Sequence, residues 1–425
     1  MIDLILPWAF LITILFFFVA GTPLFIILGA SSLFCIYWFA GQPLAVIFAE
    51  AYRLVSNPVL VSIPLFTFAG YIMAESKMPS RLVEVNNALL GWLPGSITWV
   101  TIASCALFTA FTGASGVTII AVGGLLLPAL MKSGYSERLS MGLVTSSGSL
   151  GLLFPPSIPV ILYGFIGGVD IQSIFTAGIL PGLLLMLVWG GYPFLTALKN
   201  KMPRDKFEIR RIYLAVRKAI WEIPIPILIL VGIYGGFATV TEVAALTAAY
   251  VFIAEVLINR DMNFKRLYRV TIDSVKMVGA ILMILCMALA FSYFIVDFRI
   301  PYEVVEFMKQ FTESKIVFLM MLNGLLLIVG CFLDIFSAIM VVVPLITPIA
   351  LSFGVDPVHL AIIFLVNLEI GYCTPPIGLN LFISSFRFNK SVVYLYGSVF
   401  PFLLLGIITL LLITYVPGLS LWLGS

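Results

Sequence analysis

Long apolar runs alternate along the chain with short polar, glycine or proline breaks. Two apolar runs come first, at 4–20 and 23–40, and a similar pair follows later, at 222–238 and 240–259. Runs of this length can cross a bilayer as helices. Almost no residues separate the members of each pair, so we expect two helical hairpins.

A shorter amphipathic stretch follows each pair, at 42–57 and 262–276. Mixed apolar and charged faces suit a helix that lies in the membrane interface, and an ordinary connecting helix packed on protein is the alternative. The recurrence of the stretch in both places favours the interfacial arm. Further membrane-crossing helices are expected at 57–73, 174–199, 277–296 and 392–415.

Two longer apolar runs, 94–130 and 314–350, carry small and polar residues at their centres. Each forms either one kinked crossing with an extension or a re-entrant hairpin of two helices. The central glycines and serines favour the hairpin, because its tip would expose backbone groups there.

Pro-Pro pairs break the next two apolar segments, GSLGLLFPPSIP (148–159) and IGYCTPPIGLN (370–380). Proline lacks a backbone N–H and pushes the preceding residue out of the helical region. Inside a membrane, broken backbone persists only where it is buried in protein or lines a cavity. Both breaks therefore indicate a site.

The helix-breaking residues recur with an offset of 220 positions. The matched pairs are Pro128 and Pro348, Gly134 and Gly354, Gly151 and Gly371, Pro155 and Pro375, Pro156 and Pro376, and Pro181 and Pro401. We therefore interpret the chain as two copies of one unit, 1–198 and 220–425, joined by a linker at 199–219. Paired broken segments in two halves are the best sequence pointer to the binding site of a secondary transporter.

Composition supports an integral membrane protein of the all-α class. Of the 425 residues, 62% are hydrophobic and 10% are charged, whereas soluble domains carry about 25% charged residues. The apolar runs do not alternate with polar residues as the strands of a barrel do. The net charge of +3 is too small to indicate nucleic-acid binding.

The chain offers little enzymatic chemistry. Its five cysteines are isolated, and His359 is its single histidine, so we expect neither a His or Cys metal centre nor disulfides. An intramembrane hydrolase would need a nucleophile with a base or two aspartates, and is disfavoured. No enzyme activity is expected.

Charge predicts the orientation. The stretch 199–218 holds eight basic and two acidic residues, and 260–269 holds four more basic residues. By the positive-inside rule both lie in the cytoplasm. The first-half arm and the chain ends carry few charges and are expected to be periplasmic. The two units would then have inverted topology.

Two acidic residues of the second half lie inside apolar stretches: Asp334 is the only charge in the run 316–353, and Glu369 lies just before Gly371. A carboxylate inside a membrane is a functional hypothesis by default, and a structural cap on a broken helix is the alternative. Unwound carbonyls and hydroxyls suit sodium, and helix N-termini suit a carboxylate. Proton coupling through Asp334, Glu369 and His359 is the competing hypothesis.

Three stretches resemble the large membrane subunit of the tripartite ATP-independent periplasmic (TRAP) transporters. They are FTAFTGASG (108–116), LLPALMKSGYSERLSMGLVTSSGSLGLLFPPSIPVILYG (126–164) and the run from GCFLDIFSAIM to PPIGLNLF (330–382). The resemblance implies a sodium-coupled elevator transporter for organic acids in the bacterial inner membrane. It implies as partners a small membrane subunit, a periplasmic substrate-binding protein and membrane lipid, and no cofactor besides sodium.

The resemblance also implies site residues. A first sodium site would use Ser104, Thr145, Gly148, Leu150 and Pro155, and a second would use Gly330, Asp334, Gly371, Thr374 and Ile377. Substrate contacts are expected at Ser115, Ser157, Ser337 and Asn380. The hairpins and broken helices, 94–168 and 314–386, would belong to a mobile domain, 94–171 plus 314–391, that slides on the remaining scaffold. Sialic acid, on overall likeness, and C4-dicarboxylates are the expected substrate classes.

Overall fold

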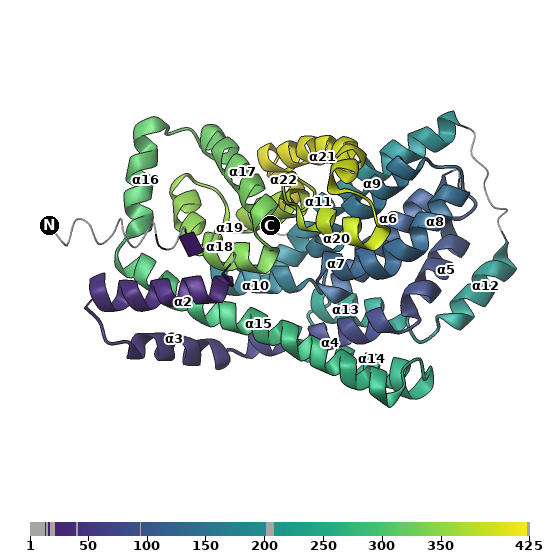
Figure 1. The fold of residues 1–425 in the computed structure, drawn as a ribbon, viewed down its shortest axis with the longest axis horizontal. Coiled ribbons are helices and arrows are strands. Elements are labelled where there is room, and N and C mark those ends of the chain that lie inside the picture. Colours follow the sequence, from purple (N-terminus) through teal and green to yellow (C-terminus); the bar gives the residue numbers. More distant parts are fainter. Residues whose placement is uncertain are drawn as a thin grey trace.

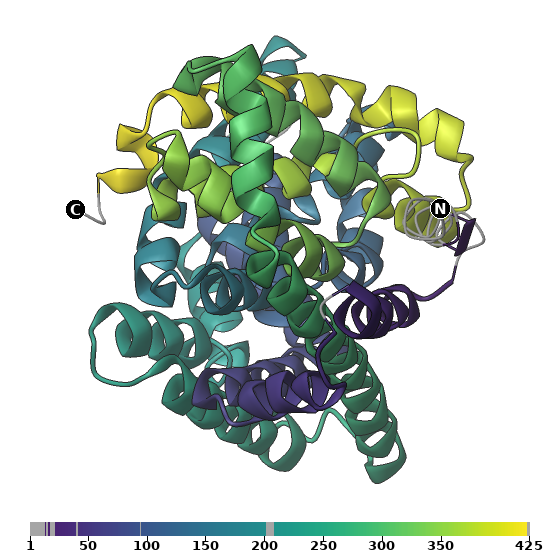
Figure 2. The same ribbon diagram turned by 90° about the vertical axis from the view of Figure 1, so that its left-hand side faces the viewer.

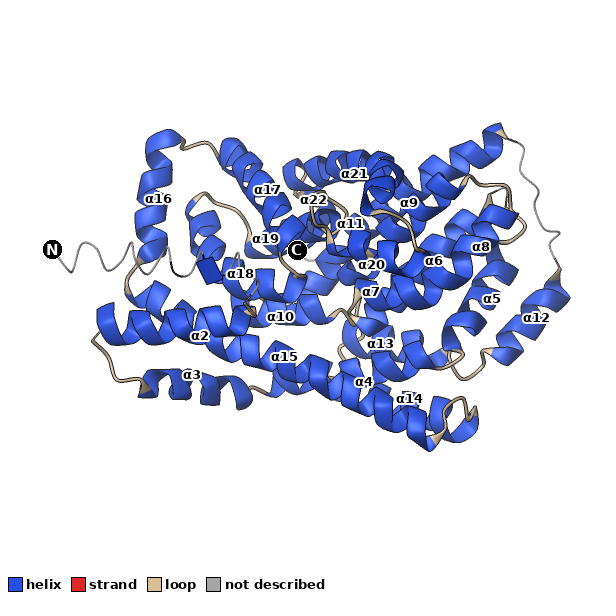
Figure 3. Cartoon of the chain, viewed as in Figure 1, coloured by secondary structure: helices blue, strands red, loops and turns tan. Residues whose placement is uncertain are grey.

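The computed structural model describes residues 22–39, 41–93, 95–200 and 208–422, together with positions 13, 16 and 17. Its described part consists of helices and connecting loops (Figure 3). Within those residues, eight helical segments are long and apolar enough to cross a membrane. The all-α prediction is confirmed, while the expected segment 4–20 lies largely outside the described residues.

The first half begins with the segments that precede its long hairpin. They are α2 (Leu24–Phe34), the π-helix η1 (Cys35–Phe39), α3 (Ala45–Val55), the 3-10 helix η2 (Pro58–Val61), α4 (Ser62–Glu75) and α5 (Met78–Leu90). The hairpin and the broken helix then follow as α6 (Ser96–Thr112), α7 (Ser115–Thr118), η3 (Ile119–Gly123), α8 (Gly124–Lys132), α9 (Glu137–Ser147), η4 (Leu150–Leu153), α10 (Ile158–Gly167) and α11 (Ile171–Lys199).

The second half repeats this order. After α12 (Ile209–Lys218) come α13 (Pro224–Tyr234), α14 (Val240–Val251), η5 (Phe252–Ile258), α15 (Phe264–Asp297) and α16 (Ile300–Phe311). The hairpin and the broken helix are α17 (Lys315–Phe332), α18 (Ile335–Ser352), α19 (Pro357–Gly371) and α20 (Leu379–Phe388), followed by α21 (Val392–Tyr415) and α22 (Gly418–Leu421).

Four helices differ from the expected elements. The segments expected at 262–276 and 277–296 form the single helix α15, because the position that matches the helix-breaking Pro58 of the first half is Val278. The short helices α5 and α16 were not anticipated, since charged residues interrupt their apolar pattern. Part of the linker forms the helix α12, whose buried Ala215 packs against α5.

Both long hairpins fold back on themselves as expected. In the first, the Thr98 hydroxyl at the start of α6 donates to the Tyr135 hydroxyl beyond α8, at 2.9 Å. In the second, the rings of Phe318 and Phe353 stack with centroids 4.5 Å apart, and Lys315 Nζ donates to the Gly354 carbonyl at 2.6 Å. The second arm of each hairpin therefore returns to the start of the first.

The halves pack on each other reciprocally. Helix α2 lies along α15, and its counterpart α14 lies along α4, in the lower part of Figures 1 and 2. Gln42 Nε2 donates to Asp297 at 3.3 Å, and the Lys77 backbone N–H donates to Asp261 at 3.0 Å. Lys77 and Asp297 are 220 positions apart, and Gln42 and Asp261 are 219 apart, so the two halves contact each other through nearly equivalent positions. We call this layer, α2 to α5 with α13 to α16, the base layer.

The hairpins and broken helices form the second layer, in the upper part of Figure 1. Helix α11 packs on η4 and α19, where Gly178 lies against the Leu153 carbonyl, and α21 packs on α9. The two helices also contact each other, since Trp189 Nε1 donates to the Phe402 carbonyl at 2.9 Å. The domain boundaries 94–171 and 314–391 stay a prediction. The packing nevertheless groups α11 and α21 with the segments expected to move.

One partly buried guanidinium joins three segments of the base layer. Arg81 Nη2 lies 2.9 Å from Glu255 and 2.7 Å from Asp261, and Arg81 Nε contacts Glu222. Burial works to raise the pKa of Asp261, but hydrogen bonds from Arg81 and from the Lys77 backbone outweigh it and lower that pKa. We call these four side chains the Arg81 cluster.

Replacing Arg81 with glutamine is expected to lower the free energy of unfolding by about 3–5 kcal/mol, because it leaves three buried carboxylates without a cation. The matched control is Lys218→Gln, which breaks the ion pair between Lys218 and Glu84, both about half exposed. An exposed pair contributes less than about 1 kcal/mol. Unfolding curves of the purified variants measure both values, and equal small losses would show that the cluster is not structural.

Candidate functional site

Four chain breaks converge in the second layer. A Cβ atom on Gly113, at the first hairpin tip, would lie 2.8 Å from the Ile158 side chain at the start of α10. A Cβ atom on Gly116 would lie 2.5 Å from Ile383 of α20. At the second hairpin tip, the Ile335 backbone N–H donates to the Tyr372 hydroxyl at 2.6 Å. The N-terminal ends of α7, α10, α18 and α20 therefore surround one region.

The two Pro-Pro pairs make the breaks in the predicted places. Both peptide bonds, Pro155–Pro156 and Pro375–Pro376, are cis. The axis of the first broken segment turns by 47° between η4 and α10. After the second pair, the Gly378 N–H donates to the Cys331 carbonyl at 3.1 Å, so the loop returns to the second hairpin tip. Gly378 has φ +56, and a Cβ atom there would lie 2.8 Å from the Tyr372 carbonyl oxygen, which is why glycine is needed.

Of the residues expected for the second sodium site, Gly330 and Gly371 lie directly against each other. A Cβ atom on Gly371 would lie 2.7 Å from the Gly330 Cα atom, so α17 and α19 cross by backbone contact. Asp334 accepts backbone N–H bonds from Phe336 and Ser337, at 3.1 Å each, and its other oxygen contacts the Ser337 hydroxyl. Asp334 is thus the N-cap of α18.

The remaining two residues of that set lie on the loop between α19 and α20. The Thr374 hydroxyl donates to the Ile370 carbonyl at 3.0 Å, and the Ile377 side chain is exposed. The same loop contacts the second hairpin tip through Gly378 and Cys331. The structure therefore brings the second set to one region between hairpin tip and loop.

Replacing Gly371 with alanine is expected to lower the free energy of unfolding by about 1–3 kcal/mol, because the new methyl group overlaps the Gly330 backbone. Gly324→Ala on α17 is the control: nothing lies within 4 Å of its Cβ position, and alanine is favoured over glycine in a helix by about 0.5–1 kcal/mol. Thermal unfolding in detergent checks both. Opposite signs are expected, and equal effects would contradict the backbone crossing.

The residues expected for the first sodium site divide between two places. The Thr145 hydroxyl donates to Ser384 at 2.8 Å, and the Thr145 carbonyl accepts from Asn380 Nδ2 at 3.2 Å. The Gly148 carbonyl accepts from the Thr109 hydroxyl at 2.7 Å. The Ser104 hydroxyl instead accepts from Asn86 Nδ2 of α5, at 2.9 Å. Thr109, and not Ser104, is the α6 hydroxyl that contacts the turn after α9.

The last two members of the first set lie on the break itself. Leu150 is fully buried in η4. Pro155 lines an apolar cavity of about 410 Å³, and Asn86 lines it too. Of the residues expected for the first sodium site, Thr145 therefore contacts the second half of the chain, whereas Ser104 contacts the base layer.

The four residues expected at the substrate lie at helix starts. Ser115 is the first residue of α7, Ser157 is the N-cap of α10, Ser337 lies in the first turn of α18, and Asn380 lies in the first turn of α20. All four are buried. Backbone N–H groups at helix starts suit an anionic group.

Several buried oxygen and hydroxyl groups in this region have no partner in the described structure. They are Ser146 Oγ, Ser157 Oγ, Asn380 Oδ1 and both carboxylate oxygens of Glu369. Buried polar atoms are nearly always paired, so unpaired ones in one region indicate a place for water, an ion or a substrate. Among the described residues no group of three or more His, Cys, Asp or Glu side chains could hold a metal ion, whereas hydroxyl and carbonyl oxygens suit sodium.

The three groups of the proton hypothesis do not form one hydrogen-bonded chain. Asp334 is bonded within its own helix start. His359 bonds to the Ser420 hydroxyl at 2.6 Å and to the Thr414 carbonyl at 3.2 Å, next to α22. The sequence analysis did not single out Thr109, Ser384 and Tyr372, which contact the site. Thr109 and Tyr372 lie inside the quoted stretches FTAFTGASG and IGYCTPPIGLN, and Ser384 follows Asn380 by one helical turn.

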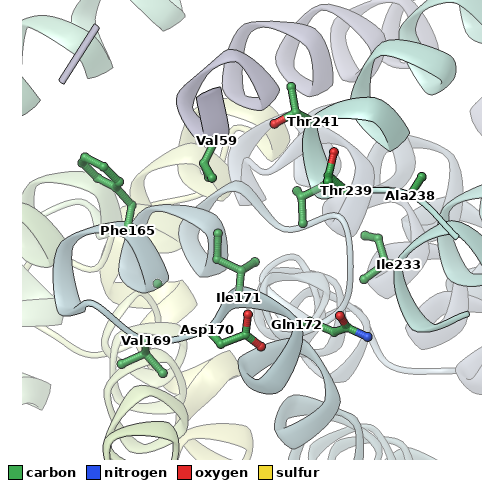
Figure 4. Close-up of a pocket in the computed structure, with 12 residues that line it drawn as sticks. Val59, Phe165, Val169, Asp170, Ile171, Gln172, Ile233, Ala238, Thr239 and Thr241 are labelled. Atoms are coloured by element: carbon green, nitrogen blue, oxygen red, sulfur yellow. The ribbon is translucent and has the colours of Figure 1, made fainter. Parts of the chain in front are cut away.

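A separate hollow of about 390 Å³ lies away from the breaks (Figure 4). The turns before α11 and before α14 line it, with Asp170, Thr239 and Thr241 among its polar residues. The Asp170 carboxylate is already engaged as the N-cap of α11, accepting from the Ser173 N–H at 2.7 Å. None of the expected site residues lines this hollow.

Comparison with known proteins agrees on one family. Residues 11–419 match the model of the tripartite ATP-independent periplasmic transporter, DctM component. The isethionate TRAP transporter permease protein DctMQ of Oleidesulfovibrio alaskensis is 34% identical over 96% of this chain, and the chain spans 64% of that protein's length. The C4-dicarboxylate TRAP transporter large permease protein DctM of Pseudomonas aeruginosa is 32% identical, over 93% of this chain and 94% of its own.

The chain is also similar in fold to a solved structure. The crystal structure of the Alcanivorax borkumensis YdaH transporter, described as having an unusual topology, matches with a TM-score of 0.59 over 87% of this chain and 86% of its own. The sequences are 13% identical, so this likeness concerns the fold alone.

Proposed function

Because the chain belongs to the DctM component family of the tripartite ATP-independent periplasmic transporters, we propose that it carries a small organic anion across the bacterial inner membrane, driven by sodium. The observation that carries the proposal is the convergence of four helix starts on a region with unpartnered buried oxygens. The substrate would meet backbone N–H groups and hydroxyls there, and its charge would be held by helix ends.

Sodium would bind on either side of this region. At the first sodium site, the turn at Thr145 and Gly148 offers backbone carbonyls. At the second sodium site, the Asp334 carboxylate adjoins the turn from Gly371 to Thr374. Both Pro-Pro breaks free backbone carbonyls of this kind. Asp334 would contribute charge to the ion as well as capping α18.

Among the substrate classes expected from the sequence, the names of the two relatives reported above support a compact anion. Two relatives are named for isethionate and for C4-dicarboxylates, and no relative reported above is named for sialic acid. We therefore propose a small carboxylate or sulfonate. Arg387 is the basic residue on α20, but its Nε donates to the Ile120 carbonyl at 3.0 Å, so it holds the first hairpin in place.

The two halves contact the base layer differently, which supports movement between two states. In the first half α6, the first hairpin arm, packs on α4 and α5. In the second half the base-layer helices α15 and α16 instead pack on α18, which is the second arm of its hairpin. The first arm of that hairpin, α17, packs on α19. If the halves are inverted copies, each half can adopt the contacts that the other half now makes with the base layer. This exchange would open the site to the opposite side of the membrane. We propose that the second layer, including α11 and α21, slides on the base layer between these two states.

The proposed assembly has two further proteins. A small membrane subunit and a periplasmic binding protein would complete the transporter, the linker 199–219 would face the cytoplasm, and both termini would face the periplasm. The basic residues of the linker support this orientation.

Uptake into proteoliposomes tests the function. The full chain is reconstituted with the small subunit and the binding protein, and labelled succinate or isethionate is supplied with an inward sodium gradient. We expect uptake that collapses when choline replaces sodium or when the binding protein is omitted. Uptake that ignores sodium but follows a pH gradient would refute the sodium proposal.

Proton coupling is the second candidate, and Glu369 favours it. Its carboxylate is fully buried in α19 and neither oxygen has a partner in the described structure. A buried acid without a partner is a common element of proton relays. Under this mechanism Glu369→Gln would abolish uptake driven by a pH gradient. If the same variant still takes up substrate with a sodium gradient, proton coupling through Glu369 is rejected.

A further inference from the structure

Helix α12 presents a basic and apolar face that no described residue covers. One side packs on α5 (Figure 1). Ala215 there lies against Val85 and Ala88. Ile209 and Tyr213, one helical turn apart, are 76% and 64% exposed. Two arginines, Arg210 and Arg217, are exposed on the same helix. Residues four positions apart lie on one side of a helix, so the exposed apolar strip runs beside the basic one.

The start of α15 repeats this arrangement. Phe264 and Tyr268, one turn apart, are 85% and 63% exposed. Lys265 and Arg269, also one turn apart, are exposed beside them. Within the described part of the chain, neither of these two, nor Arg210 or Arg217, forms an ion pair.

The Arg81 cluster holds both segments at one end of the base layer. Glu222 follows α12 by four residues, and Asp261 precedes α15 by three. Arg81 contacts both carboxylates, at 2.7 Å for Asp261. The two basic segments are therefore anchored to a single guanidinium. We call the exposed side chains Arg210, Tyr213, Arg217, Phe264, Lys265 and Arg269 the basic platform.

We propose that the basic platform binds anionic phospholipid headgroups of the adjacent leaflet. Both segments lie between apolar helices, α12 between α11 and α13 and the start of α15 directly after η5, so they lie where chains leave the bilayer. Basic side chains there attract lipid phosphates, and exposed aromatic rings lie at the headgroup level. Cationic charge without acidic partners, combined with exposed apolar rings, matches an anionic lipid rather than a soluble ligand.

This surface would hold the base layer in place while the second layer moves. Helix α5 carries α12 on one side and donates from Asn86 to Ser104 of the first hairpin on another. If lipid anchors the base layer, α5 stays in place while the first hairpin moves relative to it.

Lipid binding by the purified full chain tests the proposal. Native mass spectrometry in detergent measures the apparent affinity for dioleoyl phosphatidylglycerol and for dioleoyl phosphatidylcholine. We expect the double variant Arg210→Gln, Arg217→Gln to lose about 25-fold in affinity for the anionic lipid, since each basic residue contributes about fivefold, and to keep its affinity for phosphatidylcholine. Tyr213→Ser is expected to weaken binding of both lipids.

The matched control removes the same charge elsewhere. Lys132 and Lys276 are exposed on α8 and in the middle of α15, and replacing both with glutamine is expected to leave phosphatidylglycerol binding unchanged. Unfolding temperatures identify any variant that fails to fold, and Lys265→Gln with Arg269→Gln is then the second test pair. Equal loss in control and test variants would overturn the proposal. Displacement of the lipid by the small membrane subunit would also overturn it, and would assign the surface to that subunit.

Discussion

Replacing Asp334 with asparagine is expected to reduce sodium-driven uptake by roughly 10- to 150-fold while leaving the protein folded. A hydrogen bond or ligand contact to a charged group contributes about 1.5–3 kcal/mol, which corresponds to that range of rate or affinity. Asparagine caps a helix as well as aspartate does, so the bonds from Phe336 and Ser337 would survive. The variant removes charge at constant shape, and uptake measured against external sodium reports the change.

Asp356 provides the matched control for Asp334. It is the N-cap of α19, and its carboxylate accepts from the Val358 and His359 backbone N–H groups. Asp356→Asn therefore changes the same chemistry at a helix start outside the site, and we expect normal sodium dependence. If the two variants behave alike, Asp334 is a structural cap and the second sodium site needs another ligand.

Cross-linking the two layers is expected to stop transport almost completely in either of two states. In the present state Asn86 of α5 contacts Ser104 of α6, so Asn86→Cys with Ser104→Cys should join through a short thiol cross-linker. The positions 220 further on are Glu306 and Gly324. Gly324 has open space around its Cβ position and Glu306 is exposed, so the second pair should join only after the layers have moved.

The reduced form of each double variant is its own reference for uptake. The native cysteines are replaced first, and cross-linked fractions are read from gel mobility. We expect sodium and substrate to change the yields of the two pairs in opposite directions. If Glu306→Cys with Gly324→Cys never joins under transport conditions, the halves do not exchange contacts and the sliding mechanism fails.

Some properties of this protein follow from local chemistry and could be predicted. The length of an apolar run fixes the length of the helix it forms. The bounds predicted for α11 and α21 therefore nearly match the observed ones. Proline and glycine restrict the backbone wherever they occur, so the Pro-Pro breaks and the offset of 220 positions were visible in the sequence. The folded-back shape of both hairpins followed from their length and their small central residues.

Other properties arose only in the tertiary structure. The hydrogen bond between Thr145 and Asn380 joins residues 235 positions apart, and no local pattern encodes which helices cross. The contact of Gly330 with Gly371, the choice of Asn86 as the partner of Ser104, and the Arg81 cluster depend on packing in the same way. The sequence by itself determined where the chain must break, because breaking is a property of single residues. Which breaks meet, and which oxygens remain unpaired between them, was decided by the packing of the two halves.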